Sequence, residues 1–231
     1  MRYLQLDFIR GIAIILMVMF HISFDLNYFH FIHIDIYNHH SLHWYYFRLV
    51  IVTLFLLSVG ISLVLSYENT LNRKKLIKRL IVLGGASALI SLVTYFIFPH
   101  SWIYFGVLHF ITLATLLGLP FIRHEYIALI LGVGIVLLYK FDIISMHPIF
   151  NFIAPYLHLP HRTEDLVPLT PWFGVVLIGI FLGRKRLFLF PLVQNSFTQK
   201  IAFLGKHSLF IYLAHQPLFF GAIWAISAMT H

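Results

Sequence analysis

The sequence predicts an all-α fold, a polytopic membrane helical bundle with about seven transmembrane helices. Of its 231 residues, 60% are apolar and only 10% are charged, whereas a soluble domain is usually about 25% charged. Apolar stretches near the length of about 20 residues that crosses a bilayer recur along the chain, without strand-like alternation. This pattern excludes a soluble enzyme, a disordered protein and a nucleic-acid partner. We expect one domain over residues 1–231, embedded in the lipid bilayer.

Six apolar stretches and one weaker stretch delimit the expected helices. They run over Phe8–Asn27, Phe47–Tyr67, Leu76–Phe98, Trp102–Ile122, Tyr126–Tyr139, Leu166–Leu182 and Ile201–Met229. The fifth has only 14 residues, about 21 Å of helix, which is short for a span. The semi-apolar stretch Ile143–Leu159 is interpreted as a re-entrant or interfacial piece, because an eighth span would place the basic residues 184–186 on the outer side.

The distribution of basic residues predicts on which side of the membrane each terminus lies. With a cytoplasmic N-terminus, the segments between spans place 12 Lys and Arg residues inside and 3 outside. Such a bias favours an N-terminus in the cytoplasm and a C-terminus outside.

The sequence contains no cysteine, which excludes disulfides, thiolate metal sites and cysteine nucleophiles.

Four ionisable residues lie in or beside the first expected helix, along one stripe. Arg10 and His21 are eleven positions apart, which leaves an angular offset of about 20°. Asp7 precedes Arg10 by three positions, and Asp25 follows His21 by four. Because charged groups in a span are costly unless they face the bundle interior or a watery cavity, we expect this stripe to line a cavity. An anchoring ion pair and a packed histidine are the alternative.

The same spacing separates Arg10 from His21 by about 16 Å along the helix axis. Asp25 is expected to accept a hydrogen bond from one ring nitrogen of His21 and leave the other as a base. His109 and His215 are predicted at a similar depth. Ser208, Tyr212 and His215 fall on one helical face.

Five sequence pieces, in order along nearly the whole chain, resemble a known family. They are Leu6-Asp7-Phe8-Ile9-Arg10-Gly11 followed by an apolar run to His21, residues 55–63 (FLLSVGISL), residues 105–109 (FGVLH), residues 168–174 (PLTPWFG) and residues 205–217 (GKHSLFIYLAHQP). Together they are similar to the transmembrane acyltransferases, above all to the small bacterial members of the heparan-alpha-glucosaminide N-acetyltransferase-like family.

This resemblance implies an enzyme that moves an acetyl group from cytosolic acetyl-CoA to an amine or hydroxyl of a sugar or glycan on the outer side. It implies an integral protein of the bacterial cytoplasmic membrane. The family's lysosomal members carry their catalytic histidine just after the first span, which points here to His39 in the 39–43 cluster. The resemblance therefore leaves His21, which we favour, and His39 as candidate bases.

The expected site follows from these residues. Candidate catalytic residues are His21, Asp25, His109, His215 and His39. His109, His215, Tyr212 or a freed backbone amide is the expected donor to the oxyanion. Candidate donor-binding residues are Arg10, Asp7, Trp172, Lys206, Ser208 and Tyr212. Acetyl-CoA is the expected donor, no metal is expected, and a homodimer stays open. Direct transfer and an acyl-histidine intermediate both stay open, and a small proton-coupled transporter or permease is the alternative function.

Overall fold

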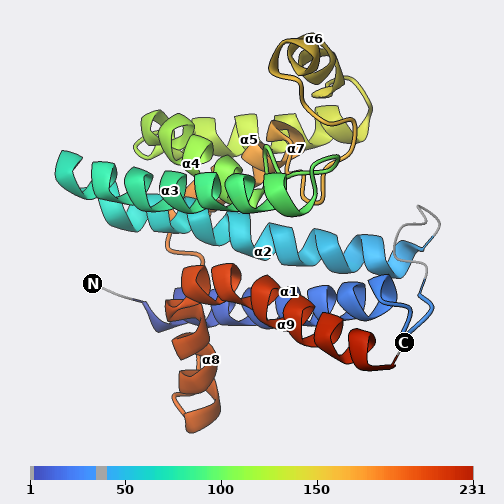
Figure 1. The fold of residues 1–231 in the computed structure, drawn as a ribbon. Coiled ribbons are helices and arrows are strands. Elements are labelled where there is room, and N and C mark those ends of the chain that lie inside the picture. The colour runs from blue at the N-terminus through green and yellow to red at the C-terminus, as the bar shows by residue number, and fades with distance from the viewer. Residues whose placement is uncertain (1–2, 35–40, 231) are drawn as a thin grey trace. The chain divides into compact units, whose positions relative to one another are not determined.

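The computed structural model describes residues 3–34 and 41–230, and helices joined by short loops make up this part of the chain (Figure 1). Its helices are α1 (Leu4–Tyr28), α2 (Leu42–Tyr67), α3 (Arg73–Ile97), α4 (Val107–Gly118), η1 (Leu119–Phe121), α5 (Glu125–Lys140), α6 (His147–Leu157), α7 (Leu169–Arg184), α8 (Ser196–Lys206) and α9 (Ser208–Thr230). An isolated parallel bridge between Phe105 and Leu166 is the one β-interaction in the described residues.

The apolar helices confirm an integral membrane protein of the all-α class. Four helices are long and apolar enough to cross a bilayer, over Leu4–Tyr28, Leu42–Tyr67, Arg73–Ile97 and Ser208–Met229. Val107–Phe121 and Leu169–Arg184 are shorter apolar helices. The number of seven spans and the orientation of the termini stay predictions.

The expected helix Ile201–Met229 is wrong as a single element. The helix is interrupted at His207, between α8 and α9. His207 takes a non-helical conformation, and its amide donates to the carbonyls of Phe203 and Leu204. Asn195 begins α8 earlier than expected, because its side chain accepts a hydrogen bond from Thr198 N. Hydropathy alone missed the break, because the apolar residues Ile201–Leu204 of α8 lie close in sequence to the apolar residues of α9.

The described chain divides into two compact units. Unit 1 comprises residues 1–58 and 188–231, and unit 2 comprises residues 59–187, so the long helix α2 contributes to both. In unit 1, α9 runs alongside α1, whereas α8 crosses α1 steeply (Figure 1).

The crossing of α1 and α8 depends on two glycines. A Cβ atom on Gly205 would lie 1.8 Å from Asp7 O, and one on Gly11 would lie 2.0 Å from Ile201 O. The two backbones therefore touch, and only hydrogen fits between them at both positions. Both glycines belong to the sequence pieces quoted above, which gives those pieces a packing role.

Unit 2 contains the remaining close helix contacts. A Cβ atom on Gly174 of α7 would lie 2.6 Å from Gly132 O of α5, and one on Gly60 of α2 would lie 2.2 Å from Val176 O of α7. At the start of α4, Asp165 Oδ2 accepts a hydrogen bond from Val107 N at 3.0 Å. This carboxylate caps a helix N-terminus, where an anion is stabilising.

Candidate functional site

Two histidines from different helices of unit 1 face each other. The rings of His21 on α1 and His215 on α9 lie edge to face, with centroids 4.8 Å apart. His21 Nδ1 lies 2.9 Å from Met17 O, and His215 Nδ1 lies 2.7 Å from Tyr212 O. A carbonyl oxygen only accepts, so in each neutral ring Nδ1 carries the proton and Nε2 presents a lone pair. The helix backbones thus fix the tautomer of both imidazoles.

The neighbouring polar pair is Asp25 and Gln216. Asp25 is fully buried on α1, and its Oδ1 accepts a hydrogen bond from Gln216 Nε2 at 3.3 Å. The predicted hydrogen bond from His21 to Asp25 is not formed, because Asp25 points to the next residue after His215 on α9. Gln216 is the residue that sequence reasoning missed at this position. Its place directly after His215 was the only available signal.

Three buried polar atoms of this cluster have no hydrogen-bond partner in the described part of the chain. They are Asp25 Oδ2, His215 Nε2 and Gln216 Oε1. A buried polar group without a partner costs roughly 1–3 kcal/mol, and an ionised carboxylate costs more. With the His215 proton on Nδ1, all three atoms are hydrogen-bond acceptors. A ligand that presents N–H or O–H groups would therefore satisfy them.

At the other end of the stripe, Arg10 is held by the protein. Its Nη1 lies 3.9 Å from Asp7 Oδ1, and its Nε donates to Ser58 Oγ of α2 at 3.4 Å. Asp7 is buried, which matches the expectation that this stripe faces the interior of the protein. The arrangement joins α1 to α2 through one guanidinium.

The stretch between Arg10 and His21 is packed, and this corrects the expectation of an open cavity along it. Ile14 and Met17 occupy the same helical face at 1% and 3% exposure, and they form a core cluster with Ile51 of α2. Apolar side chains fit here because the two intervening turns carry no polar residue on this face. A long substrate arm could not follow α1 without displacing them.

His109 lies in unit 2, and both of its ring nitrogens are engaged. Nδ1 accepts from Gly106 N at 3.2 Å, and Nε2 lies 2.9 Å from Ser91 Oγ. Since the Ser91 hydroxyl donates to Ile103 O, the imidazole donates to Ser91 from Nε2. One neutral tautomer satisfies both contacts, which favours a structural role in closing the loop before α4.

The other expected site residues are dispersed. Lys206 is exposed at the end of α8, Ser208 begins α9, and the ring of Tyr212 contacts His215 with centroids 5.7 Å apart. Trp172 is half-buried on α7 in unit 2. His39 lies outside the described residues.

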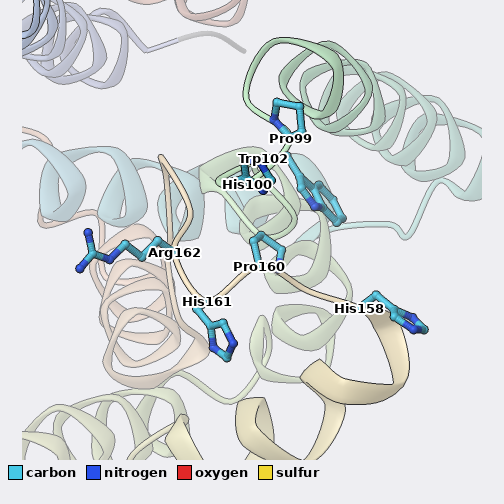
Figure 2. Close-up of a pocket in the computed structure, with 7 residues that line it drawn as sticks. All are labelled: Pro99, His100, Trp102, His158, Pro160, His161 and Arg162. Carbon is cyan, nitrogen blue, oxygen red and sulfur yellow. The ribbon is translucent and has the colours of Figure 1, made fainter.

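Histidines also line an open depression in unit 2, of about 470 Å³, between residues 99–102 and 158–162. Figure 2 shows His158, His161 and Arg162 pointing away from one another, so these side chains do not converge on one ligand position. No group of three or more histidine, aspartate or glutamate side chains in the described residues could hold a metal ion.

The comparisons with known proteins agree with the sequence pieces quoted above. The family model for the catalytic part of heparan-alpha-glucosaminide N-acetyltransferase matches residues 2–217, a range that includes His21, Asp25, His215 and Gln216. No curated protein and no solved structure matches the chain significantly. Because the match covers most of the chain, the protein belongs to the heparan-alpha-glucosaminide N-acetyltransferase catalytic family.

Proposed function

We propose that this protein transfers an acetyl group from acetyl-CoA to an amine or hydroxyl of a sugar or glycan acceptor, at the cluster formed by His21, His215, Asp25 and Gln216. Membership of an acetyltransferase family supports the class of reaction. The observation that carries the site is the set of three buried acceptor atoms without partners between α1 and α9. An acceptor that presents several N–H or O–H groups suits such a set.

The chemistry follows from the tautomers. A neutral imidazole with its lone pair on Nε2 takes the proton from the attacking amine or hydroxyl, which then bonds to the thioester carbonyl carbon while the carbon–sulfur bond breaks. The proton passes to the leaving thiolate. His215 Nε2 is buried and without a partner, so His215 is the preferred base, and His21 stands beside it as the second imidazole. Two imidazolium rings this close would repel, so the pair is suited to take up one additional proton at a time.

Asp25 and Gln216 would position the acceptor. With Gln216 Nε2 donating to Asp25 Oδ1, the two remaining oxygens form one acceptor surface beside His215. An N–H or O–H group bound there lies next to the base. The oxyanion of the tetrahedral intermediate requires a donor. The neutral ring of His215 offers none toward the substrate, because its Nδ1 proton is used by Tyr212 O. We therefore assign His215 to proton transfer rather than to the oxyanion.

The test measures release of coenzyme A thiol by the purified chain in detergent, with acetyl-CoA and a panel of amino sugars and neutral sugars, while mass spectrometry follows the acceptor. His215→Ala should lower kcat by about 10²–10⁴-fold, the usual contribution of a general base. Asp25→Asn should raise KM for the acceptor more than it lowers kcat. His124→Ala, at an exposed position before α5, is the matched control and should retain full activity.

Two further arms make the result decisive. His39→Ala tests the base that the resemblance suggests, and loss of turnover in this variant with full turnover in His215→Ala would reject our assignment. The permease alternative predicts acceptor uptake into vesicles without thiol release. Each variant is compared by thermal unfolding, so that a loss of fold is separated from a loss of chemistry.

A further inference from the structure

We infer that unit 2 carries a phosphate-binding site where α2 ends and α3 begins, formed by Tyr67, Arg79 and Lys75. The site lies outside the histidine cluster. The inference stands without the proposed function, because it depends only on the side chains of this helical hairpin. The ligand chemistry is a phosphate monoester or diester, which a phospholipid headgroup or a soluble nucleotide can supply.

The first observation concerns Tyr67, the last residue of α2. Its side chain is 3% exposed, and its hydroxyl is buried without a hydrogen-bond partner in the described part of the chain. A buried hydroxyl usually has a partner, and leaving it without one costs about 1–3 kcal/mol. The phenol is a donor as well as an acceptor, so a phosphate oxygen would satisfy it.

The second observation concerns the cations around this phenol. Lys75 Nζ lies 5.6 Å from the centroid of the Tyr67 ring, and Arg79 is close enough for its charge to interact with the phenol. Lys75 and Arg79 are four residues apart on α3 and so share one helical face. This face therefore places an ammonium over the Tyr67 ring and a guanidinium within electrostatic range of the same phenol.

Arg79 is half-buried, and no carboxylate forms an ion pair with it among the described residues. The nearby acid at the end of α2, Glu68, is already paired with Arg184 and Arg186. A half-buried guanidinium without an anion is costly, and its fork of donors matches a phosphate in a bidentate manner. Arg79 thus has the chemistry of an anion-binding residue, and a bound ligand would supply the anion.

The third observation is the charge at the start of α3. The helix begins Arg-Lys-Lys and contains five cations in its first seven residues, with no acid in the first turn. The N-terminal end of a helix is positive, so these cations and the helix dipole repel one another. Asn72 satisfies Lys75 N through its side chain, which leaves the charge itself uncompensated. A bound phosphate would relieve this repulsion.

The experiment titrates the full-length protein, in maltoside micelles free of phosphate, with two probes and their phosphate-free counterparts. The probes are dioleoylphosphatidylglycerol against dioleoylglycerol, and adenosine 3′,5′-bisphosphate against adenosine, with dissociation constants measured by calorimetry. We expect one phosphate probe to bind at least tenfold more tightly than its counterpart. Tight binding of the lipid alone would identify a headgroup site, and tight binding of the nucleotide alone would identify a site for a soluble ligand. Either outcome supports the inference.

Three variants test the residues. Arg79→Gln should raise the dissociation constant about tenfold, the value of a charge-assisted hydrogen bond, and Tyr67→Phe about threefold. Lys78→Gln removes the same charge from an exposed position beside Arg79 and should change it less than twofold. Tyr67→Phe should also unfold at the same or a higher temperature than the unaltered chain without probe, because it removes an unpaired buried hydroxyl.

Three outcomes would overturn the inference. The first is equal binding of a phosphate probe and its phosphate-free counterpart. The second is an equal loss of affinity in all three variants, which would indicate diffuse attraction to a basic surface. The third is a lower unfolding temperature of Tyr67→Phe without probe, since the hydroxyl would then have an internal partner. Absence of acetyl transfer leaves all three readouts intact, so failure of the proposed enzyme activity is distinguishable.

Discussion

Replacing Gly205 with alanine should separate α8 from α1. The new Cβ atom would lie 1.8 Å from Asp7 O, whereas ordinary contacts begin at 3.4 Å, so α8 would have to withdraw by about 1.6 Å. The atom that it meets is backbone, which cannot rotate away. Ile201, which is buried on α8 and lies against Gly11, would lose its contact with α1. Overpacking of this kind costs about 1–3 kcal/mol.

The measurement is thermal or denaturant unfolding of the purified protein in detergent, followed by circular dichroism. Gly221→Ala is the matched control, because Gly221 lies in α9 of the same unit and a Cβ atom there would meet nothing within 4 Å. Gly221→Ala should be neutral or slightly stabilising, since alanine favours a helix more than glycine does. Indistinguishable unfolding of Gly205→Ala and Gly221→Ala would refute the close approach of α1 and α8.

Two further predictions concern unit 2. Replacing His109 with alanine should lower the unfolding temperature, because Gly106 N and Ser91 Oγ each lose a hydrogen-bond partner. The kcat per folded molecule should stay within about twofold of the unaltered value. A selective loss of kcat would show instead that His109 is catalytic. The pKa of the Glu125 carboxyl lies below its usual 4.5 because its own backbone amide and Lys185 hydrogen-bond it. Its stabilising effect is therefore complete above that pH and is lost on acidification through the lower folded-state value. Glu125→Gln should flatten the pH dependence of unfolding below about pH 4.5; an unchanged slope would contradict this pairing.

The features of the fold that could be predicted from the sequence are those that hydropathy and helical periodicity determine. The long helices α1, α2 and α3 follow from apolar stretches of sufficient length, and the inward face of α1 follows from the cost of Asp7 and Asp25 in lipid. Helical periodicity also brought Asp7 and Arg10 together. These features depend on residues close in sequence, so a single sequence contains their signal.

The parts that could not be predicted depend on contacts between distant segments. Asp25 was expected to orient His21, its neighbour one turn away, but it hydrogen-bonds Gln216 instead, 191 positions along the chain. A helical wheel cannot weigh a partner on another helix. Likewise, nothing in the spacing of Arg10 and His21 distinguishes a cavity from the packed Ile14 and Met17, because both are compatible with one apolar face.

The break at His207 connects the packing of the helices with the proposed chemistry. Gly205 holds the end of α8 against Asp7, so the start of α9 at Ser208 is fixed relative to α1. From that start, His215 lies seven residues on, about 10 Å along α9, where it meets His21. A single continuous helix over these residues would lack the turn that directs α9 alongside α1. The Gly205 contact therefore sets the register that pairs the two imidazoles, and Gly205→Ala should reduce acetyl transfer even in molecules that remain folded.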